Sequence, residues 1–314
     1  MESSSVNSGL PTVPIWQAPT GSIAGPELCT AVANAGGVGA MGVTWTDRDV
    51  AADWVRQVRA HTKGMFLVNF ALAFEPKALS AVLDARPPIV SFSWGDPGRH
   101  AELVKSAGAK LAIQVTTGAA ARKVLRHAPN FFICQGIEAG GHVEGTLPLL
   151  QALDEVLSAA DGVPVIAAGG IATREDVECV LDAGAAGAML GTRFVACRES
   201  RAHPEYKRLL IEGTATELTT CFSDGWPNAK HRVLANPTLE MWKRAGEPEG
   251  PDRPGEADSL ALMGSVPILR YEDTAPRVGM EGNIGEMCLY AGTGVGKIGD
   301  IPSAAELVER LSPS

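Results

Sequence analysis

Residues 130–142 read Asn130-Phe-Phe-Ile-Cys-Gln-Gly-Ile-Glu-Ala-Gly-Gly-His142, a short apolar run that passes at Gln135 into a glycine-rich loop. A second stretch of similar design, Val163-Pro-Val-Ile-Ala-Ala-Gly-Gly-Ile171, follows after an Ala/Leu-rich segment. Short β-branched or aromatic runs that alternate with longer amphipathic segments are typical of parallel strands joined by helices. The two stretches therefore predict an α/β fold with loops at the ends of its strands.

The same alternation extends outward over residues 13–193. We predict eight strands, at Val13–Gln17, Gly37–Met41, Met65–Asn69, Ile89–Phe92, Lys110–Gln114, Asn130–Gln135, Val163–Ala167 and Ala186–Leu190. Helices are expected near Pro26–Ala35, Asp47–Ala60, Pro76–Asp84, Pro97–Ala107, Gly118–His127, Leu147–Ala160 and Thr173–Ala183. Eight β units favour a closed (β/α)8 TIM barrel over an open doubly wound sheet, which usually has fewer units or a second domain.

The pattern changes after Arg193, and this divides the chain. We expect a flexible Ser-rich tail at residues 1–9, a barrel core at 10–195, a helical lid or subdomain at 196–288, and a C-terminal segment at 289–314 that closes on the barrel. The lid contains a loop rich in Pro, Gly and acidic residues at 246–256. Long excursions from such barrels usually serve the active site, so the lid is expected over the mouth.

Composition narrows the classes of function. The chain has 314 residues and a formal net charge of −9, without the clusters of Lys and Arg that nucleic-acid binding needs. Its six cysteines are scattered, without metal-binding spacing, and suggest reduced thiols in a cytoplasmic protein. A Ser-rich start without an apolar run does not resemble a secretory signal, and no uninterrupted apolar stretch is long enough to span a membrane.

The active site of a barrel lies where its strands end, so the residues at those positions are the candidates. They are Ala18, Pro19 and Thr20 after the first strand, Asn69 after the third, Gln135, Gly140, Gly141 and His142 after the sixth, Gly169 and Gly170 after the seventh, and Met189, Leu190, Gly191 and Thr192 at the eighth. Glycines at the last two strand ends, each before a helix, predict a phosphate site built from backbone N–H groups.

His142 is the expected acid/base residue. Flexible glycines place it at the barrel mouth, and an imidazole exchanges protons near neutral pH. The other histidines, His61, His100, His127, His203 and His231, are expected at the surface. Four tryptophans, Trp45, Trp94, Trp226 and Trp242, could line the pocket or fill the core, and core packing is the more common role.

A glycine-rich segment near the C-terminus, Ala291-Gly-Thr-Gly-Val-Gly-Lys-Ile-Gly299, imitates two nucleotide-binding motifs. It matches GxGxxG, but no βαβ unit follows it, and it resembles a P-loop that has Ile298 where Ser or Thr is required. We interpret it as a glycine-rich loop, one that could approach a bound cofactor.

These residues resemble the nitronate monooxygenases, formerly called 2-nitropropane dioxygenases. The resemblance is carried by Gln17-Ala-Pro19, Val68-Asn-Phe70, Val90-Ser-Phe92, Gln135 to His142, Val163 to Ile171, Ala185 to Thr192 and Leu289-Tyr-Ala-Gly292, and so spans most of the chain. It implies a barrel that holds FMN without a covalent bond. The implied reaction converts a nitronate, or a nitroalkane deprotonated by His142, and O2 into a carbonyl compound and nitrite.

The resemblance also implies roles within the FMN site. Ala18, Pro19 and Asn69 would lie along the isoalloxazine, Gln135 and Gly140 beside the ring and ribityl chain, and Gly170 and Met189 to Thr192 around the phosphate. Thr20, Gly141 and Gly169 belong to the same loops and are assigned to the site with them. The expected partners are a small-molecule substrate and O2, with a homodimer possible and no nucleic acid or membrane.

Three positions depart from the family pattern. Thr20 stands where the family usually has Met, His142-Val-Glu-Gly145 replaces His-Arg-Gly, and Gly225-Trp-Pro-Asn-Ala-Lys-His231 replaces a Gly-Arg-Pro-Ala-Arg-like segment. Two other interpretations therefore stay open. The barrel and histidine motif also resemble FMN-dependent enoyl-acyl-carrier-protein reductases and NADH:quinone reductases, which take hydride from a nicotinamide. A non-catalytic flavin or phosphate-binding scaffold would require His142 to be idle.

Overall fold

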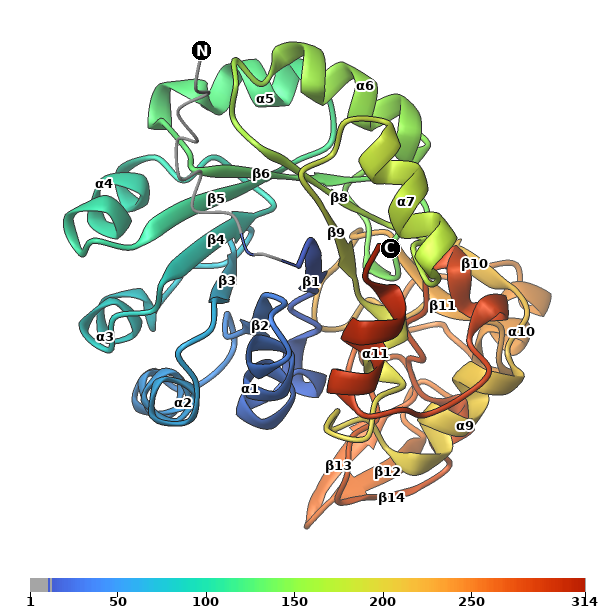
Figure 1. Ribbon diagram of the computed structural model, residues 1–314. Coiled ribbons are helices and arrows are strands. Elements are labelled where there is room, and N and C mark those ends of the chain that lie inside the picture. Colours follow the sequence, from blue (N-terminus) through green and yellow to red (C-terminus); the bar gives the residue numbers. More distant parts are fainter. Residues whose placement is uncertain (1–10, 12, 314) are drawn as a thin grey trace, which may run out of the picture.

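Eight parallel strands form the centre of the computed structural model, which describes residue 11 and residues 13–313 (Figure 1). The predicted tail at residues 1–9 lies outside the described residues. The strands are β1 (Ile15–Gln17), β2 (Gly39–Gly42), β3 (Phe66–Ala71), β4 (Ile89–Ser93), β5 (Lys110–Val115), β6 (Phe131–Gln135), β8 (Val165–Ala168) and β9 (Gly187–Leu190). Their order in the sheet is β1-β9-β8-β6-β5-β4-β3-β2. All eight strands predicted from the sequence are confirmed.

The barrel closes between β1 and β2. Trp16 forms a parallel bridge with Val38, and the Gln17 and Val38 backbone N–H groups donate to Val38 and Ile15, each at 2.9 Å. The buried Gln17 side chain adds to this seam, since its Oε1 accepts from the Ala40 backbone N–H at 2.7 Å. The first and last sheet positions are therefore joined, and the predicted closed barrel is confirmed.

The helices that connect successive strands lie on the outside of the barrel (Figure 1). They are α1 (Pro26–Asn34), α2 (Arg48–His61), α3 (Leu79–Asp84), α4 (Arg99–Ser106), α5 (Gly118–Val124), α6 (Leu149–Ala159) and α7 (Arg174–Asp182). Helix α7 begins with the predicted cap, because Thr173 accepts from the Asp176 backbone N–H and the Asp176 side chain accepts in return from Thr173. Local sequence thus sets the helix starts that lie beside the barrel mouth.

Alternating side chains divide the core into two layers. Trp16, Phe131 and Met189 belong to a cluster inside the barrel, where Trp16 and Phe131 pack edge to face at 5.3 Å. A larger cluster fills the space between the strands and the helices and includes Leu190. Because successive strand residues face opposite sides, neighbouring Met189 and Leu190 enter different layers.

The region after the barrel strands contains both helices and strands, where the sequence predicts a helical lid or subdomain. It contains α8 (Thr192–Val195), α9 (Pro204–Glu212), β10 (Thr216–Thr219), β11 (His231–Leu234), α10 (Pro237–Arg244), β12 (Ser259–Met263), β13 (Val266–Leu269) and β14 (Met280–Gly282). Strands β12 and β13 pair as an antiparallel hairpin around the two residues Gly264 and Ser265, and Gly264 has a φ of 62°. A Gly-containing two-residue turn between apolar runs is a hairpin signal, which the prediction missed.

The subdomain is tied to the barrel loop that carries His142. Strand β11 pairs with β10 on one side and, on the other, with β7 (Gly141–His142), so that His231 lies opposite His142. The β10-β11-β7 sheet therefore holds part of the glycine-rich loop in place. Antiparallel pairing with a segment about 90 residues later in the chain gives this loop a fixed position.

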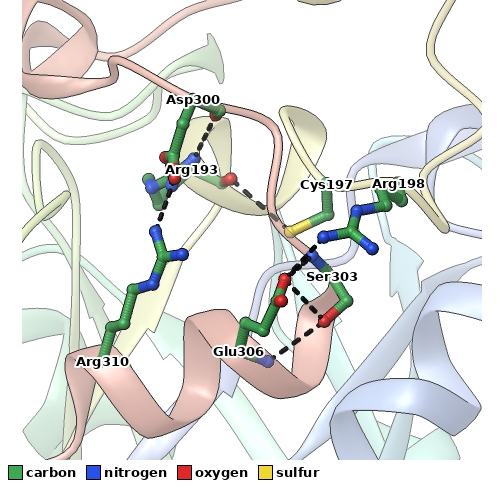
Figure 2. Close-up of polar contacts among 7 residues, drawn as sticks. All are labelled: Arg193, Cys197, Arg198, Asp300, Ser303, Glu306 and Arg310. Carbon is green, nitrogen blue, oxygen red and sulfur yellow. Dashed lines mark hydrogen bonds and ion pairs between the residues drawn. The ribbon is translucent and has the colours of Figure 1, made fainter.

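The C-terminal helix α11 (Ala304–Leu311) fastens the end of the chain to α8 (Figure 2). The Asp300 carboxylate accepts from both Arg193 and Arg310, and Arg198 donates to Glu306 at 2.8 Å. Ser303 caps α11 in a capping box with Glu306. Arg193 directly follows Thr192, so these contacts support one of the loops at the barrel mouth.

A buried lysine supports the same region and gives a stability prediction. The Lys207 ammonium donates to the backbone carbonyls of Cys197, Arg198 and Ser200 at 2.6, 3.2 and 2.8 Å. We expect Lys207→Met to lower the free energy of unfolding by about 2–4 kcal/mol, because three carbonyls lose their charged donor. Denaturant unfolding measures the change. Lys105→Met, which removes only an exposed pair with Glu102, is the control and should change it by less than about 0.5 kcal/mol; equal effects would contradict the assignment.

Candidate active site

A cavity of about 730 Å³ lies where the barrel strands end, and residues of the C-terminal region line it as well. This volume lies within the range of roughly 300–1,000 Å³ that is usual for ligand sites. All but one of the predicted site residues line it: Ala18, Pro19, Thr20, Asn69, Gln135, Gly140, Gly141, His142, Gly169, Gly170, Met189, Gly191 and Thr192. The fold thus brings together residues from five strand ends.

Leu190 is the exception and is absent from the lining. Its side chain is buried in the layer between strands and helices, while its carbonyl accepts from the Ala18 backbone N–H at 2.9 Å. The alternation of strand side chains explains this, since Met189 faces the barrel interior. Leu190 therefore packs against the helices and positions the Ala18 loop through its backbone.

Gln135 braces the loop that ends at His142. Its Oε1 accepts from the backbone N–H of Glu144 at 2.9 Å and of Gly145 at 3.3 Å, and its Nε2 donates to the His142 carbonyl at 3.3 Å. A single amide thus satisfies three backbone groups that the turn leaves unpaired. The side chain lines the cavity and fixes the backbone from His142 to Gly145.

His142 lies in an aromatic environment that keeps its imidazole neutral. Its ring centroid lies 4.4 Å from that of Trp226 and 5.6 Å from that of Tyr290. Burial, assisted by nearby His231, lowers the pKa of His142 to about 3. The Nε2 atom is buried and has no hydrogen-bond partner among the described residues. At neutral pH the ring therefore offers a proton-accepting nitrogen and carries no charge.

His231 is fully buried, so the expectation of a surface position is wrong for it. Its Nε2 accepts from the Phe222 backbone N–H at 3.2 Å, which leaves Nδ1 to donate to the Ala229 carbonyl at 3.0 Å. Both nitrogens are occupied, and burial lowers the pKa of His231 to about 4. His231 is therefore a neutral structural neighbour of His142. His127 is also buried, where it contacts Asp96 at 2.7 Å.

The low pKa of His231 makes stability depend on pH. The unfolded chain takes up a proton at this histidine below its ordinary pKa of about 6.5, whereas the folded protein takes it up only near pH 4. The contribution of neutral His231 to the free energy of unfolding is therefore complete above pH 6.5 and is lost as the pH falls towards 4. From pH 7 to pH 5 we expect the free energy of unfolding to fall by about 2 kcal/mol more in the native protein than in His231→Gln. Denaturant unfolding at both pH values measures this difference. Equal falls in the free energy of unfolding of the two proteins would contradict the role of His231.

Glycines from three loops meet in a close-packed cradle at one part of the cavity. A Cβ on Gly140 would lie 2.4 Å from the Gly292 nitrogen, and one on Gly294 would lie 2.3 Å from the Gly170 oxygen. Gly170 has a φ of 69°, which bulky residues avoid. The loops after β6 and β8 thus pack backbone against backbone on the segment that begins η4 (Thr293–Lys297). A side chain at Gly140 or Gly294 would force these segments apart.

The cradle presents unused hydrogen-bond donors to the cavity. Within residues 13–313, the backbone N–H groups of Gly170, Gly191 and Thr192 donate to no protein acceptor. The Thr192 hydroxyl oxygen accepts from the Gly292 N–H at 2.9 Å, which leaves its own O–H free to donate. Neutral donors without a carboxylate among them fit an anionic group such as a phosphate.

Asp273 and Arg277 also line the cavity, although no sequence pattern points to them. Trp45, Trp94 and Trp226 line it, which is the less common of the two roles predicted for them; Trp226 and Trp94 also pack in a small hydrophobic cluster, and Trp242 packs in another. Glu138, inside the recognised motif, accepts from the Leu149 backbone N–H at 2.9 Å and so caps α6. The loop at Gly292 and Gly294 does line the cavity, as its suggested approach to a cofactor requires.

Two absences apply to the described part of the chain, residues 11 and 13–313. No group of three or more His, Cys, Asp or Glu residues there could hold a metal ion. None of the helices there is long and apolar enough to cross a membrane.

Curated proteins that are similar to this chain include monooxygenases and a dehydrogenase. The nitronate monooxygenase of Pseudomonas aeruginosa is 29% identical over 95% of both chains. A (3aS,4S,5R,7aS)-5-hydroxy-7a-methyl-1-oxo-octahydro-1H-indene-4-carboxyl-CoA dehydrogenase of Mycobacterium tuberculosis is 32% identical over 76% of this chain and 67% of its own.

Solved structures agree with the fold. Nitroalkane oxidase from Streptomyces ansochromogenes superposes with a TM-score of 0.80 at 29% identity, covering 97% of this chain and 96% of its own. FabK from Thermotoga maritima gives a TM-score of 0.79 at 25% identity, covering 96% and 92%. The profile of the family described as nitronate monooxygenase matches residues 5–78 and 71–314. With its barrel, its glycine cradle and its cavity histidine, this chain belongs to the nitronate monooxygenase family.

Proposed function

We propose that the protein is an FMN-dependent enzyme that oxidises nitronates with O2 to a carbonyl compound and nitrite. The observation that carries this proposal is the single cavity that joins a neutral, unpartnered histidine to a cradle of backbone donors. Membership of the family and the relatives named nitronate monooxygenase support it. The proposed partners are therefore a small-molecule substrate and O2.

FMN fits the residues present. The N–H groups of Gly170, Gly191 and Thr192 and the Thr192 hydroxyl would hold its phosphate. Ala18, Pro19, Asn69 and Gln135 would lie along the flavin, together with the lining residues Thr20, Gly140, Gly141 and Gly169, and Met189 would lie near the phosphate donors. When bound, the flavin supplies the electron transfer between the nitronate and O2. The protein contributes shape, donors and proton control.

The orientation of the predicted ring-binding residues is fixed by hydrogen bonds from neighbouring strands. The Asn69 amide nitrogen donates to the Ser91 hydroxyl at 3.0 Å, and Gln135 is held by the His142 loop. Arg277 is the cationic side chain among the described lining residues, and its guanidinium makes no ion pair with them. These groups would bind and orient an anionic substrate against a flat cofactor.

The state of His142 favours nitronates over neutral nitroalkanes. A nitronate has already lost its α-proton, whereas a nitroalkane needs a base to remove it. Because burial holds the pKa of His142 at about 3, the imidazole is a weak base in this cavity. We infer that His142 stays neutral beside the anion and accepts a proton only when the neutral nitroalkane is the substrate.

A nicotinamide-dependent reductase is the second candidate, of the quinone reductase or enoyl-acyl-carrier-protein reductase type. The structural likeness to FabK, at a TM-score of 0.79, supports it. Steady-state assays separate the two candidates. With ethyl nitronate and air, nitrite release that matches aldehyde formation and requires O2 is the result we expect. NADH or NADPH oxidation that needs a quinone or enoyl thioester, without any nitrite, would transfer the function to the reductase.

The cellular setting is a proposal as well. All six cysteines are unpaired, which supports a reducing compartment such as the cytoplasm. A homodimer is proposed from the sequence, and analytical ultracentrifugation would test it.

A further inference from the structure

Three tryptophans from separate loops form one face of the cavity next to His142. Trp45 follows β2, Trp94 follows β4, and Trp226 comes from the segment between β10 and β11. Trp226 is the centre of the group, with ring centroids 4.7 Å from Trp94 and 6.0 Å from Trp45. Phe74 packs behind them, 4.9 Å from Trp226 and 5.1 Å from Trp45. We call Trp45, Trp94 and Trp226 the aromatic wall.

The backbone holds Trp94 in the wall at a conformational cost. Its φ is 59°, in the left-handed region that bulky side chains rarely adopt, and Gly95 follows with a φ of 155°. Strain of this kind persists only where surrounding contacts enforce it, and it gathers at functional sites. The fold therefore holds the Trp94 backbone in a conformation that tryptophan disfavours. A tryptophan that only fills the core does not need such a backbone.

Glu144 helps to enforce this placement. Burial raises the pKa of Glu144, and hydrogen bonds from the Gln114 side chain and the Trp94 backbone offset part of the rise. The Gln114 amide lies 3.2 Å from the carboxylate. Glu144 stands in the short segment after His142 where the sequence departs from the family pattern, so the departure and the strained tryptophan are connected in space.

The wall contacts the proposed catalytic histidine directly. The Trp226 ring is tilted by 32° from the plane of the His142 ring, at a centroid distance of 4.4 Å. Trp94 approaches His142 edge to face at 6.4 Å. At the other end of the wall, Trp45 is 60% exposed, which is unusual for so large an apolar side chain. The wall thus runs from His142 to the outer part of the cavity.

The packing of the rings indicates which ligand they suit. Because Trp226 packs directly on both Trp94 and Trp45, at interplanar angles of 57° and 63°, the three rings form a continuous apolar surface. Asp273 is the one carboxylate among the described residues that line the cavity, and burial raises its pKa and so disfavours its charged form. The wall therefore suits a flat apolar group attached to an anionic reacting centre.

We propose that the aromatic wall is a substrate subsite for aryl substituents, so that the preferred substrates are nitronates that carry an aromatic ring. This inference rests on the proposed nitronate oxidation and names its substrate class. The ring of the substrate lies against Trp94 and Trp226, and its nitronate group lies beside His142. Trp45 contacts the outer edge of longer substituents.

The test compares nitronates that share one reacting group. We expect kcat/KM for the nitronates of phenylnitromethane and 2-phenylnitroethane to exceed that of ethyl nitronate by at least about 10-fold. Trp45→Ala should lower the ratio of 2-phenylnitroethane to nitroethane nitronate several-fold. Leu103→Ala, which removes an exposed apolar side chain on α4 outside the cavity, is the control and should keep the native ratio. If nitrite is released but kcat/KM for ethyl nitronate equals or exceeds that for the aryl nitronates, the aryl subsite is wrong. The proposed function would still hold in that case.

A binding measurement keeps the two proposals separable. Benzoate and acetate are planar anions that imitate nitronates but are not oxidised, and calorimetry gives their Kd without turnover. We expect benzoate to bind at least about 10-fold more tightly than acetate to the FMN-loaded protein. If no nitronate yields nitrite but benzoate still binds more tightly, the proposed function is wrong and the wall remains an aryl site. Equal binding of both anions, or tighter binding of benzyltrimethylammonium than of benzoate, would overturn the subsite.

Discussion

Replacing His142 by Asn is expected to lower kcat/KM for neutral nitroethane by about 10²- to 10⁴-fold, the usual contribution of a general base. The amide has no basic nitrogen, so it cannot take the α-proton that a neutral imidazole in the cavity can accept. The same variant should lose less than about 10-fold with ethyl nitronate, because that substrate needs no deprotonation. Initial rates of nitrite release with each substrate give both values.

The control for this variant is His61→Asn. His61 lies at the exposed end of α2, where its imidazole contacts the Gln57 carbonyl at 2.8 Å, and neither substrate should respond to its loss. Two results would contradict the role of His142. Equal losses with nitroethane and its nitronate would make His142 a positioning residue, and unchanged rates with both would make it idle.

Gly294→Ala is expected to weaken FMN binding by about 10- to 100-fold. A Cβ at this position would lie 2.3 Å from the Gly170 carbonyl oxygen, so the loop from Gly292 must move away from the cradle. Overpacking against a backbone typically costs about 1–3 kcal/mol, and the displaced groups include the Gly292 N–H that orients the Thr192 hydroxyl. Quenching of FMN fluorescence on binding to the apoprotein measures the Kd.

Gly299→Ala is a closely matched control for this loop. Gly299 lies five residues further along, a Cβ added there would meet no atom within 4 Å, and its φ is outside the left-handed region. Its Kd for FMN should equal that of the native protein. A Gly294→Ala protein that binds FMN as tightly as the Gly299→Ala protein would show that the phosphate lies elsewhere.

The sequence predicts the barrel and most of its cavity because the relevant signals are local. Each strand is a short apolar run, and Asn69, Gln135 and Gly170 stand at strand ends that a closed barrel must bring together. Caps such as that of Thr173 are also encoded within one turn of helix. Leu190 is misassigned because a prediction from strand ends alone does not apply the two-residue alternation of side chains.

The features that the sequence does not predict depend on contacts between segments that are far apart in the chain. His231 is buried because β11 pairs with β7. No residue near His231 in the sequence indicates that β7 is the pairing partner. The aromatic wall likewise joins Trp45, Trp94 and Trp226 from three separate loops. The β12-β13 hairpin is a different case, since its Gly264 turn is visible in the sequence but the surrounding region suggests helices.

The most direct test of flavin-dependent nitronate oxidation is anaerobic titration of the FMN-loaded protein, followed by absorbance near the flavin maximum. We predict that ethyl nitronate bleaches the bound flavin without oxygen, that admitted air restores the yellow spectrum, and that NADH and NADPH alone do neither. Bleaching by a nicotinamide with no response to nitronate would contradict the account and establish a reductase.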